Sequence, residues 1–342
     1  MPSIPRRTLL VGAAGAAAAS GFTGASMASG SPLARTGARL GSVVRWAGSD
    51  RYEGSAKIAQ QAFRPGVARL YVASGEVFTD ALSAAPIAAR DKAPILLAKK
   101  TILRTTVLNA IAALTPETIV VLGGQNSVGS EVADQLAQMA PTQRWDGADR
   151  YSASANMSAA SFDPGVPTAY IASGLVFPDA LSAAPVAGMT PGPILLSASD
   201  KLPSAIADEL TRLSPGNIVV VGGESTLSPA LFASLTAYTS GSVTRWAGAD
   251  RFATSAAISA ASFAPGVGRV FVASGRTFPD ALAGAPVAGL RKAPMLLVDT
   301  DSIPDPIKAE LLRLNPAKII ILGGDATVTK AVETELAAYV RP

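Results

Sequence analysis

Short runs of apolar residues alternate along this chain with segments in which apolar residues recur at helical spacing. Between residues 42 and 140 the short runs predict strands: one that ends at Arg45–Trp46, and three at 69–74 (RLYVAS), 94–98 (PILLA) and 118–124 (TIVVLGG). The helically spaced segments between them predict helices at 52–63, 80–90, 105–114 and 130–140. Such strand–helix alternation predicts an α/β fold in which a mostly parallel sheet is flanked by helices.

This order of elements is written three times. The phrase RWAGSDR at 45–51 returns as RWDGADR at 144–150 and as RWAGADR at 245–251, and these phrases hold all three tryptophans. Longer phrases recur at the same offsets, such as VASGEVFTDALSAAP at 72–86. A period of about 100 residues is the size of a domain and too long for a solenoid unit. We therefore predict three homologous modules at 42–141, 142–242 and 243–342, packed with pseudo-threefold symmetry.

The segment before the repeats has the composition of an export signal. Arg6–Arg7 precede a weakly apolar, Ala- and Gly-rich run, and small residues surround a plausible cleavage position after Ala28. We expect residues 1–28 to be a twin-arginine-like signal peptide and residues 29–41 to be a linker. The alternative is a membrane anchor, but the run from Thr8 to Ala19 is shorter than the ~20 residues that a span needs.

Composition removes several classes of function. The chain has no cysteine and no histidine, which excludes disulfides, thiolate nucleophiles, the usual zinc sites and imidazole acid–base chemistry. Its net charge of +4 is small for 342 residues and is not concentrated as in a nucleic-acid binder. We expect no cofactor, no metal, no nucleic acid partner and no membrane span once the signal is cleaved; the oligomeric state is open beyond the internal pseudo-trimer.

The recurring polar residues follow the strands. AGSDR, SGEVFTD and GGQNSVGS come after strands of the first repeat and have close variants in the other two, whereas the loops at the opposite edge vary. Ligands of parallel sheets bind beyond the carboxyl ends of the strands. We therefore expect one crevice per module, and three similar crevices in all.

Two sets of aspartates lie in these loops. Asp50, Asp149 and Asp250 occupy helix N-cap positions, where a carboxylate stabilises the helix. Asp80, Asp179 and Asp280 open the next helix, where a carboxylate favours the positive end of the dipole. Capping or ion pairing is one interpretation. The other is that a pair such as Asp50 and Asp80 does acid–base work or holds magnesium.

Arginines at two positions of the seven-residue phrase are candidate binding residues. Arg51, Arg150 and Arg251 stand in the first helical turn, where a cation opposes the dipole, so each needs an anion nearby. That anion is either the Asp80-type carboxylate or an anionic group of a ligand, which arginine holds in a bidentate manner. We add the arginines that open the phrase as candidates: Arg45, Arg144 and Arg245. The tryptophans beside them are either core residues or platforms for sugar rings.

The repeated phrases resemble the type 2 cell wall-binding repeat, which usually occurs in threes on exported proteins of Gram-positive bacteria. RWAGADRFATS, VASGRTFPDALAGAP, APMLL and ILGGDATVT carry the resemblance, which covers about residues 42–342. It implies a Toprim-like fold, non-covalent attachment to an anionic cell-wall polymer (teichoic-acid-like or polysaccharide), and a place at the cell wall.

The resemblance also implies site residues. The family's ILL element, tied to polymer binding, falls on Ile95, Leu96 and Leu97, on Ile194, Leu195 and Leu196, and on Met295, Leu296 and Leu297. The family commonly has threonine three places after the second arginine; here Gly54 and Ala153 replace it and only Thr254 keeps it.

Two functional hypotheses follow. The first is a non-catalytic, multivalent wall-binding protein, in which three weak sites act together on a repetitive polymer. The second is an exported hydrolase or a phosphosugar-binding protein that uses the strand-end crevices. Three near-identical sites in tandem favour the first, and we see no effector domain outside the repeats.

Overall fold

The computed structural model describes residues 41–341, so the predicted export signal lies outside the described residues. The first repeat comprises β1 (Ser42–Trp46), α1 (Arg51–Ala62), β2 (Arg69–Ser74), α2 (Thr79–Arg90), β3 (Ile95–Ala98), α3 (Thr105–Leu114), β4 (Thr118–Leu122) and α4 (Ser130–Ala137). The second comprises β5 (Thr142–Trp145), α5 (Arg150–Ala159), β6 (Thr168–Ser173), α6 (Pro178–Met189), β7 (Ile194–Ser197), α7 (Ser204–Leu213), β8 (Asn217–Val221), α8 (Pro229–Ser234) and a 3-10 turn, η1 (Leu235–Tyr238). The third comprises β9 (Val243–Trp246), α9 (Arg251–Ser262), β10 (Val270–Ser274), α10 (Pro279–Leu290), β11 (Met295–Val298), α11 (Asp305–Leu314), β12 (Lys318–Leu322), α12 (Lys330–Leu336) and η2 (Ala337–Tyr339).

These elements form three four-stranded parallel sheets, which confirms the predicted α/β class and its threefold repetition. The strand orders are β3-β2-β4-β5, β7-β6-β8-β9 and β11-β10-β12-β1. In each sheet the buried central strands are short and almost wholly apolar, as in IVV of β4 and III of β12. Strands of this kind are covered on both faces by helices.

The sheets do not coincide with the sequence repeats. The first strand of each repeat pairs with the fourth strand of the repeat before it: Trp145 lies opposite Leu122, and Trp246 lies opposite Val221. Each sheet therefore contains three strands of one repeat and one strand of the next. The intervals predicted from the sequence begin with a strand that belongs to the preceding sheet.

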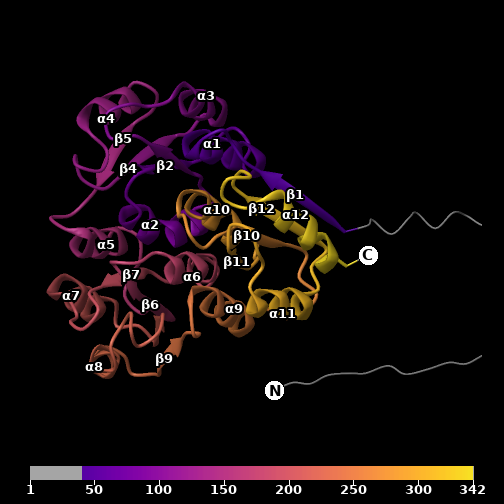
Figure 1. The fold of residues 1–342 in the computed structure, drawn as a ribbon. Coiled ribbons are helices and arrows are strands. Elements are labelled where there is room, and N and C mark those ends of the chain that lie inside the picture. The colour runs from indigo at the N-terminus through magenta and orange to yellow at the C-terminus, as the bar shows by residue number, and fades with distance from the viewer. Residues whose placement is uncertain (1–40, 342) are drawn as a thin grey trace, which may run out of the picture. The chain divides into compact units, whose positions relative to one another are not determined.

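The exchange of strands also closes the chain into a ring. β1 has no preceding repeat, and it pairs with β12 of the third repeat, placing Trp46 opposite Leu322. Figure 1 shows the indigo β1 beside the yellow β12. Gly41 lies against Val340 and Arg341, so the two ends of the repeat region are neighbours.

The second helix of each repeat lies at the centre of the molecule. Helices α2, α6 and α10 pack against one another and are buried along almost their whole length (Figure 1). Small residues make this possible: a Cβ added at Gly188 or Gly289 would come within 2.5 or 2.8 Å of the Cβ of Ala89. The three backbones therefore approach too closely for larger side chains.

Three phenylalanines mark the pseudo-threefold axis. Phe78, Phe177 and Phe278 immediately precede the central helices, and their ring centres are 5.7, 5.8 and 5.8 Å apart. These nearly equal spacings show that the three repeats meet in equivalent ways. Within residues 41–341 no helix combines the length and apolar character needed to cross a membrane.

Candidate functional site

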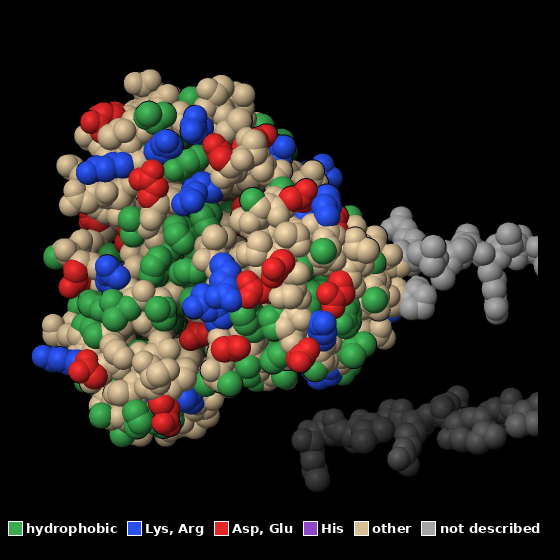
Figure 2. All heavy atoms as spheres, in the orientation of Figure 1, with side chains coloured by type: hydrophobic (Ala, Val, Ile, Leu, Met, Phe, Trp, Pro, Cys, Tyr) green, Lys and Arg blue, Asp and Glu red, His purple; other side chains and the backbone are tan. Residues whose placement is uncertain are grey.

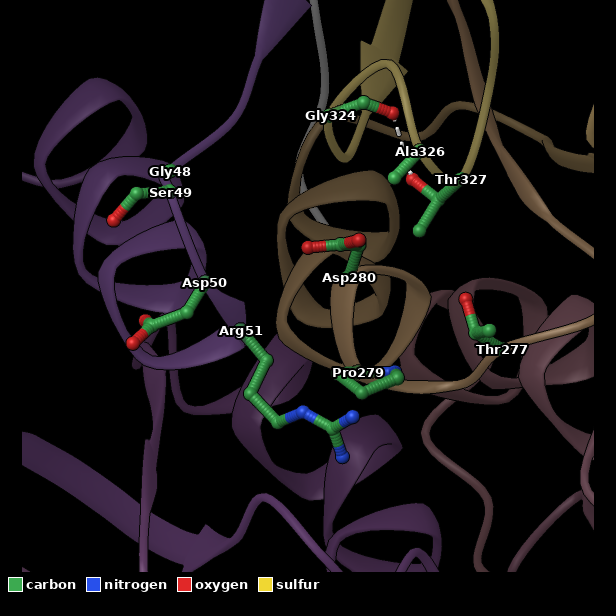
Figure 3. Close-up of a pocket in the computed structure, with 10 residues that line it drawn as sticks. All are labelled: Gly48, Ser49, Asp50, Arg51, Thr277, Pro279, Asp280, Gly324, Ala326 and Thr327. Atoms are coloured by element: carbon green, nitrogen blue, oxygen red, sulfur yellow. Dashed lines mark hydrogen bonds between the residues drawn. The ribbon is translucent and has the colours of Figure 1, made fainter.

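Three equivalent crevices open at the carboxyl edge of the sheets, and each lies between two repeats. We name them by the repeats that they join. Crevice 3–1 is lined by Gly48, Ser49, Asp50, Arg51, Thr277, Pro279, Asp280, Gly324, Ala326 and Thr327 (Figure 3). Crevice 1–2 contains Asp80 with Arg150, and crevice 2–3 contains Asp179 with Arg251. The sequence predicted three similar crevices, one within each module; the exchanged strands place them at the junctions.

An aspartate caps the helix that opens each crevice. The side chain of Asp50 accepts hydrogen bonds from the backbone N–H groups of Tyr52 (3.0 Å) and Glu53 (2.9 Å). Asp149 and Asp250 do the same at the starts of α5 and α9. Because these oxygens are held by backbone donors, the capping aspartates fix the start of the helix and the direction of the arginine that follows.

The following arginines present their guanidinium groups to the crevices. Arg51, Arg150 and Arg251 each donate one hydrogen bond, to the backbone carbonyl of Gly75 (2.5 Å), Gly174 (2.5 Å) or Gly275 (2.7 Å). None of the three has a carboxylate within 4 Å among residues 41–341. Each therefore keeps donors for a ligand.

A second aspartate forms the floor of each crevice. Asp80 is 7% exposed, and its Oδ2 accepts a hydrogen bond from the hydroxyl of Ser127 (2.9 Å). Burial raises its pKa, while this hydroxyl and the nearby charge of Arg150 oppose the rise. From the sequence, Asp80 was a candidate partner for Arg51 of its own repeat. In the structure it faces Arg150 of the next repeat instead.

The two other floor aspartates have more strongly shifted pKa values. Burial raises the pKa of Asp179 to about 6, opposed by the charge of Arg251. Burial likewise raises the pKa of Asp280 to about 6, opposed by Arg51. These carboxyl groups gain and lose their protons close to neutral pH.

The glycine pairs after the fourth strands make room for these carboxylates. Gly123, Gly222 and Gly323 have φ angles of +85°, +114° and +105°, which favour glycine. A Cβ at Gly323 would lie 2.5 Å from Oδ2 of Asp280. The first glycine of each pair is therefore needed to make room for the aspartate and not only for a tight turn.

The arginines that open the seven-residue phrase hold these turns in place. Arg45, Arg144 and Arg245 donate to the carbonyls of Gly323 (2.7 Å), Gly123 (2.6 Å) and Gly222 (2.7 Å). Each links the first strand of one repeat to the turn of the preceding repeat. All three are half-buried and none lines a crevice, so their contacts indicate a structural role.

The remaining contacts of these three arginines differ. Arg45 pairs with Glu333 at 2.9 Å, and the guanidinium of Arg245 lies 5.0 Å from the ring centre of Phe232. Ala133 is the equivalent residue in the first repeat, so Arg144 gains neither contact. Comparison of the repeats shows that this partner position varies while the arginine does not, but only the fold shows that positions 45 and 333 meet.

The ILL elements lie inside the sheets. The nine residues form β3, β7 and β11, and none is more than 1% exposed: Ile95, Leu96, Leu97, Ile194, Leu195, Leu196, Met295, Leu296 and Leu297. Their side chains do not reach the surface in this conformation. We therefore assign them to the core and leave them out of the binding surface proposed below.

The tryptophans are half-buried and pack on aromatic residues of the neighbouring repeat. The rings of Trp46 and Phe271 are 5.9 Å apart, those of Trp145 and Tyr71 5.7 Å, and those of Trp246 and Tyr170 5.8 Å. None of the three lines one of the crevices. Their contacts join the exchanged strand to the sheet that receives it.

The threonine position also has a structural explanation. The hydroxyl of Thr254 accepts a hydrogen bond from the N–H of Gly248 (2.9 Å) and so fixes the loop before α9. Gly54 replaces it in the first repeat, where a Cβ would lie 3.0 Å from Oδ1 of Asp280. Within residues 41–341 there is no cluster of three acidic side chains arranged to hold a metal ion.

Comparisons with known proteins agree with this architecture. Residues 45–133, 144–232 and 245–333 match the family model described as cell wall binding domain 2. The amidase enhancer of Bacillus subtilis (strain 168) is 27% identical over 304 residues, which are 88% of this chain and 41% of that protein. The N-acetylmuramoyl-L-alanine amidase LytC of the same organism is 26% identical over 296 residues, 86% of this chain and 58% of that protein. The chain thus spans only about half the length of these relatives.

Solved structures show the same fold. Cwp6 from Clostridium difficile superimposes with a TM-score of 0.82 at 23% identity, over 89% of this chain and 48% of that chain. Cwp8 from the same organism superimposes with a TM-score of 0.79 at 25% identity, over 87% of this chain and 51% of that chain. Because the family model covers most of the sequence in three successive matches, the chain belongs to the cell wall binding domain 2 family.

Proposed function

We propose that this protein attaches non-covalently to an anionic cell-wall polymer and that the three junction crevices are its binding sites. The observation that carries the proposal is the set of three arginines, Arg51, Arg150 and Arg251, one in each crevice. Each has a single backbone hydrogen bond and no carboxylate within 4 Å among the described residues. A free guanidinium at the mouth of a crevice suits a phosphate or carboxylate group.

Three sites on one chain suit a repetitive ligand. Linked weak sites raise the apparent affinity by roughly 10²–10⁴ when they engage the same polymer. Cell-wall polymers carry their anionic groups at regular intervals, so neighbouring crevices can bind successive groups. Membership of the cell wall binding domain 2 family and similarity to the amidase enhancer support this function.

We further propose that the binding is non-catalytic. Asp179 and Asp280 have the raised pKa values that acid–base chemistry requires, which is the observation that favours a hydrolase. In crevice 3–1, however, the carboxylate of Asp50 points away from that of Asp280 and is used as a helix cap (Figure 3). The crevice thus offers one carboxylate and one arginine, which suit binding better than hydrolysis.

Sedimentation with purified walls tests the binding. We expect the protein to bind walls, to lose binding when the anionic polymer is stripped, and to bind more weakly as salt rises. Arg51→Gln, Arg150→Gln and Arg251→Gln should weaken binding, and the triple variant should lose it. Arg64→Gln, at an exposed position outside the crevices, is the control. Full wall affinity of a folded triple variant would exclude the crevices, and release of soluble wall fragments would indicate a hydrolase.

Residues 1–28 are proposed to direct export by the twin-arginine route, which would place the protein at the cell wall. Replacing Arg6 and Arg7 by lysine should then leave the precursor inside the cell. Unchanged secretion of that variant, measured by fractionation, would contradict this route.

A further inference from the structure

The loop after the third strand of each repeat breaks the threefold symmetry in charge. We call these loops the rims. They read KKTILR at 99–104, ASDKLP at 198–203 and DTDSIP at 299–304. The first rim has three cations and no acid, the second has one charge of each sign, and the third has two acids and no cation. On the face shown in Figure 2, basic and acidic side chains are interspersed, so charge differences on it are local.

The first rim borders crevice 3–1. Nη2 of Arg104 lies 3.9 Å from Oδ2 of Asp50, a residue that lines this crevice. The guanidinium also lies 5.9 Å from the ring centre of Tyr52, directly after Arg51. The side chain of Arg104 is 48% exposed, so it is open to solvent at the edge of the crevice.

The two lysines of the first rim are not neutralised. Lys100 is exposed and Lys99 is half-buried, and neither has a carboxylate within 4 Å among residues 41–341. The carbonyl of Lys100 accepts a hydrogen bond from the N–H of Gly129 (2.7 Å), which fixes the backbone of the rim. The first rim therefore adds positive charge that an anionic ligand can reach.

The third rim has the opposite character. Arg276, which precedes α10, is held by both oxygens of Asp299 at 2.9 and 2.5 Å, and its charge is neutralised. Arg251 lies close enough to contribute to the lowered pKa of Asp299, so the arginine of crevice 2–3 faces a second carboxylate besides the floor residue Asp179. Asp301 is exposed and adds a further negative charge. This rim repels an anionic ligand.

The turns on the other flank do not reverse this difference. Asp325 follows the glycine pair beside crevice 3–1, but it lies 3.6 Å from Arg45 and 3.9 Å from Lys330. Glu224 takes the corresponding place beside crevice 2–3, where the charge of Arg245 is nearby. Both turns thus carry an acid with a cation close to it, so they do not distinguish the two crevices. Glu76, which accepts a hydrogen bond from the hydroxyl of Tyr52 (3.4 Å), offsets part of the first rim's charge and leaves it an excess of cations.

We infer that crevice 3–1, with Arg51 and the basic first rim, is the principal anchoring site for an anionic polymer, and that crevices 1–2 and 2–3 hold it more weakly. The inference rests on the proposed function, because it ranks sites assigned there to the same polymer. Arg104 lies at the edge of this crevice, and Lys99 and Lys100 stand in the same loop, so the first rim adds positive charge whose effect on a bound anion extends over roughly a Debye length, about 10 Å at 0.1 M salt. Exposed charges of this kind together change an affinity by about tenfold.

Single substitutions in otherwise intact protein test the ranking. The probe is cell wall isolated from the producing bacterium, with its anionic polymer and after removal of that polymer. We expect Arg51→Gln to weaken binding about tenfold and Arg150→Gln and Arg251→Gln about threefold or less. Equal losses in the three variants would overturn the ranking and leave the proposed function intact. Absence of binding by the unaltered protein would overturn both.

The rims supply a second, independent comparison. The variant Lys99→Gln, Lys100→Gln, Arg104→Pro removes every charge from the first rim, with the proline that the other two repeats have at that position. We expect about tenfold weaker binding and a reduced dependence on salt. Asp299→Asn with Asp301→Asn should strengthen binding, and Arg64→Gln should leave it unchanged. Thermal unfolding shows whether each variant is folded; unchanged binding by a folded first-rim variant would overturn the inference.

Discussion

At the scale of the residue, each junction places a mostly buried aspartate against a glycine. That glycine is hard to replace, because it has a positive φ and no room for a Cβ. Asp179 and Asp280 face a single arginine each, Arg251 and Arg51, and burial outweighs that attraction in setting their pKa. The ionised form of each is therefore less stable in the folded protein than in the unfolded chain. This arrangement costs stability at neutral pH and is retained where the ligand is proposed to bind.

The first prediction concerns the pH dependence of stability. Because the pKa of Asp179 and Asp280 is about 6 in the folded protein and 3.8 for an ordinary aspartate, the folded protein binds more protons than the unfolded chain between about pH 4 and pH 6. As pH rises through this range, ionisation of each aspartate lowers the free energy of unfolding, and the decrease is complete above about pH 6. Asp179→Asn and Asp280→Asn should each stabilise the protein at pH 7 by on the order of 1–3 kcal/mol, and by little at pH 4.

Asp299 provides a control of opposite sign. Its pKa is lowered because Arg276 donates hydrogen bonds to it, so its contribution is stabilising above pH 4 and is lost as pH falls. Asp299→Asn should therefore destabilise at pH 7 and have little effect at low pH. Denaturant titrations at several pH values give the comparison, and parallel curves for Asp179→Asn and the unaltered protein would contradict the assignment.

The second prediction compares two adjacent glycines. Gly323→Ala forces alanine to a φ of +105° and brings its Cβ to 2.5 Å from Asp280, so we expect a loss of about 2–4 kcal/mol. At Gly324 the nearest atom to an added Cβ is 3.9 Å away, and Gly324→Ala should cost less than about 1 kcal/mol. Equal effects of the two changes on the unfolding midpoint would show that the turn relaxes without the glycine.

At the scale of the element, the exchanged strands connect the repeats. β1, β5 and β9 lie at the edges of sheets, are only half-buried, and each brings a tryptophan onto the sheet of the repeat that precedes it in the ring. An arginine from each of them holds the glycine turn beside it. In the seven-residue phrase, the first arginine, the tryptophan and the capping aspartate therefore stabilise the fold. Only the last arginine keeps donor groups for a ligand.

The third prediction is that the three tryptophans behave alike. Trp46→Ala, Trp145→Ala and Trp246→Ala each remove an aromatic contact of 5.7–5.9 Å between repeats. For half-buried rings we expect each to lower the free energy of unfolding by about 2–4 kcal/mol. Binding to walls should fall only under conditions in which the variant unfolds. A variant that keeps its stability and loses binding would instead make that indole a sugar platform.

At the scale of the whole molecule, closure of the ring makes the three repeats interdependent. β12 has a partner on its outer side only because β1 returns to it, and crevice 3–1 is formed by the two ends of the repeat region. The proposed principal binding site thus exists only when the first and third repeats are joined. Since Gly41 and Arg341 are neighbours, the position of the chain ends within the ring is not essential to the fold.

The fourth prediction is that the ring tolerates a new opening between repeats. A circular permutant that joins residue 341 to residue 41 through a short Gly/Ser linker and opens between Ala140 and Pro141 keeps every sheet. Its free energy of unfolding should stay within about 1–2 kcal/mol of the parent. A chain without residues 1–46 lacks β1 and should be several kcal/mol less stable, with weakened wall binding. Equal stability of the truncated and parent chains would contradict closure by β1.

The sequence alone determined the elements, the threefold repetition and the capping of the helices. These features depend on local patterns: apolar runs such as IVV in β4, breakers such as RPG at 64–66, and an aspartate before the first helix of each repeat. Interactions between residues a few positions apart decide the strands, the helices and the caps, and the same local sequence occurs in all three repeats. The resemblance of the repeated phrases supplied the family and the fold of the repeat.

The tertiary structure decided which repeat completes each sheet and hence where the crevices lie. The phrase at 144–150 has the same local structure whether its strand pairs with β4 or with a strand of its own repeat, so sequence patterns do not distinguish the two arrangements. Pairing is settled by distant contacts, such as Trp145 on Tyr71 and Arg144 on the carbonyl of Gly123. The same distant contacts bring Arg51 to Asp280 across the closed ring, and they bury Ile95–Leu97 within a sheet whose last strand comes from another repeat.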